Sequence, residues 1–188
     1  MEEMRRHGGS SPAEAIIVMG VSGSGKSTLA ALLAERFGCP FLEGDSFHSE
    51  ANVAKMRRGE PLTDDDRWPW LDHLGAATGA AAQANRRAVA ACSALKRVYR
   101  DRLRAAIGLP TRFILLQANR EELTRRLNNR PGHYMPASLL DSQLALLELP
   151  GADEHALLLE GTIPPAAMLD RAAAWLDIDQ QPEARRLA

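Results

Sequence analysis

A run of residues near the start of the chain has the types and spacing that hold the phosphates of a nucleotide. Residues 20–27 fit the pattern G-x-x-x-x-G-K-[ST], in which consecutive backbone N–H groups wrap phosphate oxygens. Lys26 supplies a positive charge for the β- and γ-phosphates, and Ser27 offers a hydroxyl to Mg²⁺. The residues predicted to bind the nucleotide are Gly20, Val21, Ser22, Gly23, Ser24, Gly25, Lys26, Ser27 and Thr28.

The residues on either side supply the context that this loop requires. An apolar run from Ile16 precedes the loop and predicts a buried strand, and residues 28–34 carry apolar side chains at helical spacing. A strand, a phosphate loop and a helix in this order direct the positive end of the helix dipole at the anion. A glycine- and serine-rich linker that matches by chance is the alternative, and the flanking elements disfavour it.

Acidic side chains follow the second predicted strand. The apolar pair Phe41 and Leu42 leads into Glu43 and Asp45. Ligands of an open parallel sheet bind at the carboxyl ends of its strands, and residues two apart share a face while the chain is extended. We therefore predict that Glu43 lies on the metal side, and that Asp45 orients and deprotonates an acceptor hydroxyl. For Asp45 the alternative is a solvated turn.

Residues 61–71 contain charged and aromatic side chains suited to a small polar substrate. Aspartates that include Asp66 could hydrogen-bond a polyol, Arg67 could clamp an anion, and two tryptophans could form a wall. The alternative is a helix start in which Asp66 caps the helix. Lys96 and Arg100 lie one turn apart on a helix expected to begin at residue 93, and they could face the same anion. For Arg100 a solvated charge is the alternative.

A helix, an interrupted stretch and a second helix follow the fourth predicted strand. The helix over residues 120–128 carries Arg126, residues 129–136 contain prolines, and helical spacing then resumes. We interpret residues 120–149 as a lid, on which Arg126 and Arg130 could reach a transferring phosphoryl group when the site closes. Solvated arginines on a helix surface are the alternative.

The remaining pattern completes an α/β fold. Apolar runs at residues 88–92, 111–117 and 156–159 predict three more strands, and the last predicted helix covers residues 166–176. Strands that alternate with helices predict a three-layer P-loop NTPase fold, with a parallel five-stranded sheet and helices on both of its faces.

Length and composition favour one domain. The chain of 188 residues suits a single domain over residues 16–177, with a flexible tail at 1–15 and a polar tail at 178–188. A net charge of -1 gives no basic field, so neither nucleic acid nor a membrane surface is an expected partner. Cys39 and Cys92 lie far apart, and we expect both to be thiols in a reducing cytoplasm. No stretch approaches the ~20 apolar residues of a membrane span.

Beyond the phosphate loop, several blocks resemble the gluconokinases of the thermoresistant type. They are M-G-V-S-G-S-G-K-S from Met19, E-G-D-S-F-H from Glu43, N-V-A-K-M-R-R-G-E-P-L-T-D-D-D-R-W-P-W-L from Asn52, C-S-A-L-K-R-V-Y-R from Cys92, R-P-G-H-Y-M from Arg130 and L-E-L-P-G-A-D-E from Leu147. The resemblance implies phosphorylation of D-gluconate by ATP to 6-phospho-D-gluconate, with Mg²⁺. It also implies a fold like that of nucleoside-monophosphate and shikimate kinases, with a lid, commonly in a homodimer.

The resemblance implies roles for individual residues as well. The implied catalytic residues are Lys26, Asp45, Arg126 and Arg130, and the implied metal ligands are Ser27 and Glu43, the latter standing where many members have Asp. The implied substrate contacts are Asp45, His48, Lys55, Asp66, Arg67, Lys96, Arg100 and His133. From residue chemistry alone, two alternatives stay open: a kinase of a nucleotide or of another small hydroxy acid such as shikimate, and a nucleotide-binding regulator without turnover.

Overall fold

Five parallel strands form the centre of the fold, in the order β2-β3-β1-β4-β5. The computed structural model describes residues 12–129 and 137–178. The strands are β1 (Glu14–Met19), β2 (Phe41–Glu43), β3 (Arg87–Cys92), β4 (Thr111–Gln117) and β5 (Ala156–Glu160). Each neighbouring pair in the sheet is parallel, so the predicted five-stranded parallel sheet is confirmed.

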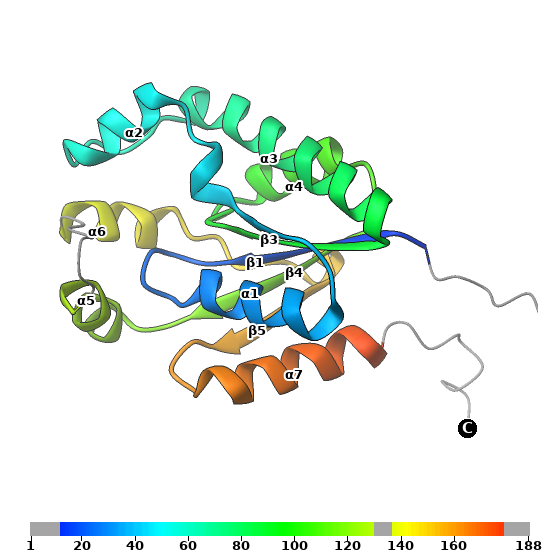
Figure 1. Cartoon of the computed structure of the whole chain (residues 1–188). Coiled ribbons are helices and arrows are strands. Elements are labelled where there is room, and N and C mark those ends of the chain that lie inside the picture. The colour runs from blue at the N-terminus through cyan, green and yellow to red at the C-terminus, as the bar shows by residue number, and fades with distance from the viewer. Residues whose placement is uncertain (1–11, 130–136, 179–188) are drawn as a thin grey trace, which may run out of the picture.

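Helices cover both faces of this sheet (Figure 1). On one face lie α1 (Lys26–Phe37) and α7 (Pro165–Ile178), and on the other lie α3 (Asp64–Asn85) and α4 (Arg97–Ile107). The shorter helices are α2 (Glu50–Arg57), α5 (Arg120–Asn128) and α6 (Ala137–Leu146), with the 3₁₀ helices η1 (Gly44–Phe47) and η2 (Ala152–Glu154) before α2 and β5. None of the helices within the described ranges is long and apolar enough to cross a membrane.

The central strand β1 shows why the sheet is covered on both sides. Ala15, Ile17 and Met19 belong to the buried cluster beneath α3 and α4. Ile16 and Val18, which alternate with them, belong to the cluster beneath α1 and α7. Alternate side chains of a strand point to opposite faces, so a strand that is apolar at every position needs a helical layer on each side.

A third apolar cluster covers the carboxyl ends of the strands. It joins Val21 of the phosphate loop, Leu95 of the loop after β3, Leu123 and Leu127 of α5, and Leu140 of α6. In Figure 1, α5 and α6 lie together at this edge of the sheet, beside the turn from β1 into α1. The helices that the sequence assigns to a lid therefore pack on the phosphate loop.

Some element boundaries differ from the predicted ones. β1 begins at Glu14, so the sheet includes two residues that were expected in the N-terminal tail. Of the two interpretations of residues 61–71, a helix start is what the structure has: Thr63 is the N-cap of α3, and Asp66 completes a capping box with it. α4 begins at Arg97 and not at residue 93, because the chain leaves β3 through a loop in which Ala94 has a φ of 41°.

Candidate active site

The phosphate loop connects β1 to α1 and approaches its neighbours closely. A Cβ atom at Gly20, where φ is 146°, would lie 2.7 Å from the carbonyl oxygen of Leu116, so only glycine fits. Gly25 is the N-cap of α1 with a φ of 95°, and the unpaired N–H groups of the first helical turn follow it. The predicted strand, phosphate loop and helix are confirmed, and they form an anion site of the kind expected at a helix N-terminus.

Two cavities meet at Lys26, the first residue of α1. The larger cavity has a volume of about 520 Å³, and its lining includes Ser22, Lys26, Asp45, His48, Arg67 and Gln143. The smaller cavity has a volume of about 460 Å³, and its lining includes Gly23, Gly25, Lys26, Ser27, Thr28 and Arg126. The side chain of Lys26 is largely buried between them. A group that is transferred from one cavity to the other therefore passes this ammonium.

Arg126 lies against the phosphate loop, in the smaller cavity. Its Nη2 donates to the carbonyl oxygen of Gly161 at 2.6 Å and its Nη1 to that of Ser24 at 3.4 Å. Its Nε donates to Oε1 of Glu122 at 2.6 Å, and ion pairs with Arg125 and Arg126 lower the pKa of Glu122 to about 2. A carboxylate that stays ionised thus holds the guanidinium at the loop. Two other predicted site residues, Arg130 and His133, lie outside the described residues.

The chain turns at the end of β2, so the expectation that Glu43 and Asp45 share a face of an extended strand is wrong. The strand ends at Glu43, and Asp45 is in the 3₁₀ helix η1. Gly44 makes the turn possible, because a Cβ there would lie 2.2 Å from the carbonyl oxygen of Ala91. Trp70 fixes it by donating from Nε1 to the carbonyl oxygen of Gly44 at 2.7 Å. Asp45 nevertheless lines the larger cavity together with Lys26.

Three residues predicted for catalysis or metal binding, Lys26, Asp45 and Glu43, act electrostatically on the thiol of Cys92 at the end of β3. Burial raises the pKa of the Cys92 thiol to about 12, with further effects from the charges of Asp45, Lys26 and Glu43. Lys26 is in α1, Asp45 in η1 and Glu43 in β2, so the three charges come from three different elements. Within the described part of the chain, Oε1 of Glu43 is buried without a hydrogen-bond partner. An unpaired buried carboxylate oxygen of this kind is suited to a ligand or an ordered water.

Arg67 projects from the first turns of α3 into the larger cavity. Its Nη1 donates to the carbonyl oxygen of Leu62 at 2.5 Å and to the hydroxyl of Tyr99 at 3.2 Å, and it lies 3.7 Å from Oδ1 of Asp64. Among the described residues, no acceptor occupies its Nε or Nη2. The guanidinium is thus held by one nitrogen and keeps two donors for a ligand, which suits a carboxylate bound at two points.

The structure pairs several predicted substrate residues with each other or with neighbours. Lys55 donates to both oxygens of Asp66, at 2.7 and 2.8 Å, and these hydrogen bonds with those from Thr63 lower the pKa of Asp66 to about 2. Lys96 donates to both oxygens of Asp64 at 3.0 Å. The lining of the larger cavity among the described residues does not include Lys55, Asp66 or Lys96. They support the walls of the site rather than forming them.

Arg100 departs furthest from its predicted place. The prediction that Arg100 contacts the substrate and the alternative that it is a solvated charge are both wrong. Its side chain is 1% exposed and forms an ion pair with Glu154. Its amphipathic helix α4 places Tyr99, Arg100 and Leu103 on the buried side. We therefore do not propose Arg100 as a substrate ligand.

His48 lies in the larger cavity and stacks on Trp70. The two rings are 4.1 Å apart between centroids and 19° from parallel. Burial lowers the pKa of His48 below its ordinary value of 6.5, against a smaller opposite effect of Asp45. Among the described residues, its buried Nδ1 has no hydrogen-bond partner. A neutral imidazole with a free nitrogen is therefore available to a substrate hydroxyl.

The lowered pKa of His48 makes the stability of the fold depend on pH. Below pH 6.5 the unfolded chain binds a proton at His48 that the folded chain does not. The free energy of unfolding should therefore fall as the pH drops from about 7 to about 5. In the variant His48→Gln, the free energy of unfolding should decrease less over this pH range than in the wild type. The variant His73→Gln, at an exposed histidine, is the control and should show the full decrease. Thermal melts at both pH values measure this, and an equal fall in His48→Gln would contradict it.

Other residues of the larger cavity were not predicted from the sequence. Gln143 of α6 accepts a hydrogen bond from the backbone N–H of Ser22 at 2.7 Å, so α6 contacts the phosphate loop directly. Arg57 of α2 and Ser93 after β3 also line the cavity. Nothing in the local sequence marks Gln143, because its position depends on how α6 packs. Arg57 was visible only as a charge on a short helix.

Comparisons with known proteins agree with this geometry. The AAA domain family matches residues 16–150. The gluconokinase of Gluconobacter oxydans is 49% identical over 155 residues, which are 82% of this chain and 86% of that protein. The thermoresistant gluconokinase of Escherichia coli is 44% identical over 144 residues, 76% of this chain and 81% of that one. A gluconokinase structure from Sinorhizobium meliloti matches with a TM-score of 0.78 and 43% identity, over 88% of this chain and 93% of that chain.

The matched regions cover most of this chain and most of the length of each relative. They agree with the resemblance of the blocks that begin at Met19, Glu43, Asn52 and Cys92. The chain belongs to the gluconokinase family of P-loop kinases.

Proposed function

We propose that this protein transfers the γ-phosphoryl group of ATP to D-gluconate, giving 6-phospho-D-gluconate and ADP. The observation that carries the proposal is the junction of the two cavities at Lys26, with the phosphate loop on one side and Asp45 and Arg67 on the other. Membership of the gluconokinase family supports gluconate as the acceptor. A sugar acid also suits a cavity that offers Arg67 for a carboxylate and Asp45 and His48 for hydroxyls.

Phosphoryl transfer needs positioned groups and neutralised charge more than covalent chemistry. Loop N–H groups and Lys26 hold the phosphates of ATP, and Arg126 adds a second positive charge at the smaller cavity. Asp45 orients the primary hydroxyl of gluconate and accepts its proton as the new O–P bond forms. Lys26, Arg126 and Asp45 thus supply the charge, positioning and proton transfer that the reaction needs.

The residues present fit a magnesium ion. The Ser27 hydroxyl lines the smaller cavity, and Glu43 has a buried oxygen without a partner in the described ranges. Hydroxyl and carboxylate oxygens are ligands that Mg²⁺ accepts, usually together with waters and substrate phosphates. Ser27 and Glu43 would hold the ion, which neutralises charge on the phosphate oxygens. Within residues 12–129 and 137–178, no group of three or more His, Cys, Asp or Glu residues could hold a metal by itself.

The substrate carboxylate is assigned to Arg67, and a conservative substitution tests this. A lysine cannot form the two parallel hydrogen bonds of a guanidinium, so Arg67→Lys should raise the KM for gluconate about 10- to 100-fold. The KM for ATP should change by less than about twofold, because Arg67 lies outside the smaller cavity. Initial rates with either substrate varied give both constants.

Arg57→Lys is the matched control for that experiment, since Arg57 lines the same cavity from α2. It should leave the KM for gluconate close to that of the wild type. A larger rise in Arg57→Lys than in Arg67→Lys would assign the carboxylate to α2 instead. If Arg67→Lys raised the KM for gluconate and the KM for ATP equally, the role of Arg67 would be structural, through its hydrogen bonds to Leu62 and Tyr99.

An ADP-release assay over a panel of acceptors tests the proposed function itself. The panel contains gluconate, shikimate, glycerate and nucleoside monophosphates, each with ATP and Mg²⁺. Gluconate should give the highest kcat/KM. Faster turnover of shikimate or of a nucleotide would show another small-molecule kinase. ATP binding without ADP release for any acceptor would show a nucleotide-binding regulator.

We further propose that the protein works in the cytoplasm as a homodimer. The dimer rests on the family resemblance, and light scattering of the purified protein measures it directly. The compartment is supported by Cys39 and Cys92, which are both free thiols in the structure.

A further inference from the structure

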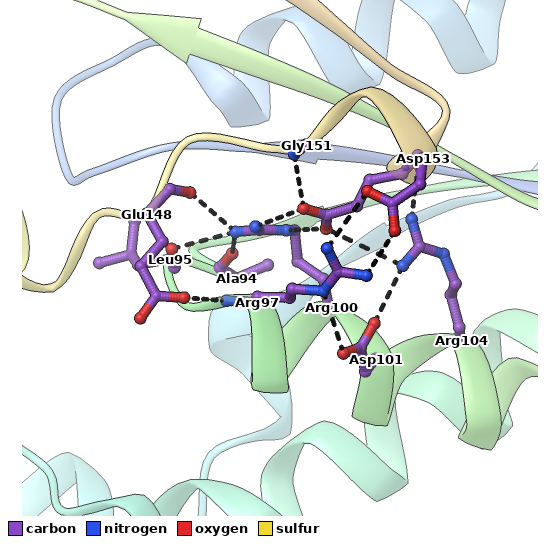
Figure 2. A network of polar contacts seen from close by, with 10 residues as sticks. Ala94, Leu95, Arg97, Arg100, Asp101, Arg104, Glu148, Gly151 and Asp153 are labelled. Carbon is purple, nitrogen blue, oxygen red and sulfur yellow. Dashed lines mark hydrogen bonds and ion pairs between the residues drawn. The ribbon is translucent and has the colours of Figure 1, made fainter.

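A buried ion pair joins α4 to η2 (Figure 2), and neither of its two residues belongs to the described lining of the larger cavity. Arg100 of α4 and Glu154 of η2 are each 1% exposed. The Nε of Arg100 donates to Oε2 of Glu154 at 2.6 Å, and its Nη2 donates to Oε1 at 2.9 Å. Two parallel charge-assisted hydrogen bonds fix the orientation of both side chains.

The remaining nitrogen of Arg100 binds the backbone of two other segments. Its Nη1 donates to the carbonyl oxygens of Leu95 at 3.1 Å and Glu148 at 3.0 Å, and more weakly to that of Ala94 at 3.4 Å. Figure 2 shows the guanidinium between these carbonyls and the carboxylate. One side chain therefore joins the loop after β3, the segment after α6 and η2.

Glu148 ties the same two segments from the other side. Its backbone N–H donates to the carbonyl oxygen of Leu95 at 2.9 Å. Its Oε2 accepts from the backbone N–H of Arg97 at 2.6 Å, which satisfies a free donor at the start of α4. Glu154 also accepts from the backbone N–H of Gly151 at 2.8 Å. The segment after α6 is thus held at both of its ends.

These segments carry two walls of the larger cavity. The loop after β3 begins with Ser93, which lines the cavity, and its Leu95 packs in the apolar cluster with Leu140 of α6. Helix α6 supplies further lining that includes Gln143, the acceptor for the phosphate-loop N–H of Ser22. The relative position of the two walls is therefore set where the segment after α6 meets the loop after β3.

We propose that Arg100 and Glu154 are positioning residues for the acceptor. Their ion pair holds the end of α6 against the loop after β3, and so it fixes the width of the larger cavity around gluconate. The inference rests on the proposed function in taking gluconate as the occupant of that cavity. The smaller cavity does not depend on the pair, because its described lining comes from other segments.

A double substitution tests the proposal without leaving a buried charge unpaired. A buried ion pair can be replaced by apolar residues of similar size with little loss of stability, so Arg100→Met with Glu154→Leu should fold. It should raise the KM for gluconate about tenfold or more and leave the KM for ATP within about twofold. A merely structural role would lower the melting temperature and the active fraction without moving the KM for gluconate alone. An unchanged KM for gluconate in the folded variant would overturn the proposal.

The exposed ion pair between Arg97 and Asp153 is the matched control, since it joins nearly the same segments at the surface. Arg97→Ala should leave both Michaelis constants unchanged, because exposed pairs contribute little. Hydrogen exchange of the Glu148 amide, measured without substrate, reports the contact itself. It should be about tenfold faster in the double variant, and an unchanged rate would contradict the proposal. Failure of the wild type to phosphorylate gluconate would instead contradict the proposed function.

Discussion

Replacing Lys26 by alanine should lower kcat by about 10²- to 10³-fold or more while the protein stays folded. The ammonium lies where the two cavities meet, and its side chain is largely removed from water. A charge in such a site acts strongly on the charge that develops during transfer, because little solvent screens it. Arg67 lines only the larger cavity and Arg126 only the smaller one, so within the described ranges no other positively charged side chain is shared by the two linings.

ADP release at saturating gluconate and ATP measures this effect, and a thermal melt shows that the variant is folded. The matched control is Arg102→Ala, which removes one positive charge from an exposed ion pair with Asp72 on the outer face of α4. It should keep the turnover of the wild type. Turnover of Lys26→Ala close to that of the wild type would contradict the assignment of the phosphate loop to catalysis.

The phosphate loop could be predicted from the sequence because its geometry is local. Its N–H donors, its glycines and its lysine follow one another along the chain, and the strand and helix that hold it are its direct neighbours. The five strands were also predictable, since short apolar runs bounded by turn residues are typical of buried strands. Both kinds of information lie within short windows of sequence.

The partners of charged side chains could not be predicted in the same way. Lys96 and Arg100 are spaced one helical turn apart in the sequence, which predicts that they share a face. In the structure, however, Arg100 forms an ion pair with Glu154 and Lys96 forms one with Asp64. Glu154 is 54 residues further along the chain, and only the packing of η2 on α4 brings it to Arg100. Tertiary structure decides whether an arginine binds a ligand or another part of the protein. The spacing of residues along one helix carries no information about those partners.

The position of Asp45 depended on a turn that the sequence did not reveal. The close approach of Gly44 to Ala91 allows η1 to begin directly after β2, and the bond from Trp70 holds it there. This turn brings Asp45 into the lining of the larger cavity, which also includes Lys26. The predicted neighbourhood was right, although the extended backbone that suggested it was not.

Asp45→Asn should therefore lower kcat by about 10²- to 10⁴-fold, the range typical of a positioned general base. Asparagine keeps the shape and one acceptor oxygen of Asp45 but loses its charge and basicity, so the affinity for ATP, measured by titration, should hardly change. Asp65→Asn, which neutralises an exposed aspartate in the first turn of α3, is the control and should keep the wild-type kcat.

Glu43→Gln should instead raise the Mg²⁺ concentration needed for half-maximal turnover, because Glu43 offers the unpaired buried oxygen. If Asp45→Asn kept its kcat and lost only affinity for Mg²⁺, Asp45 would be the metal ligand and the acceptor hydroxyl would need another base.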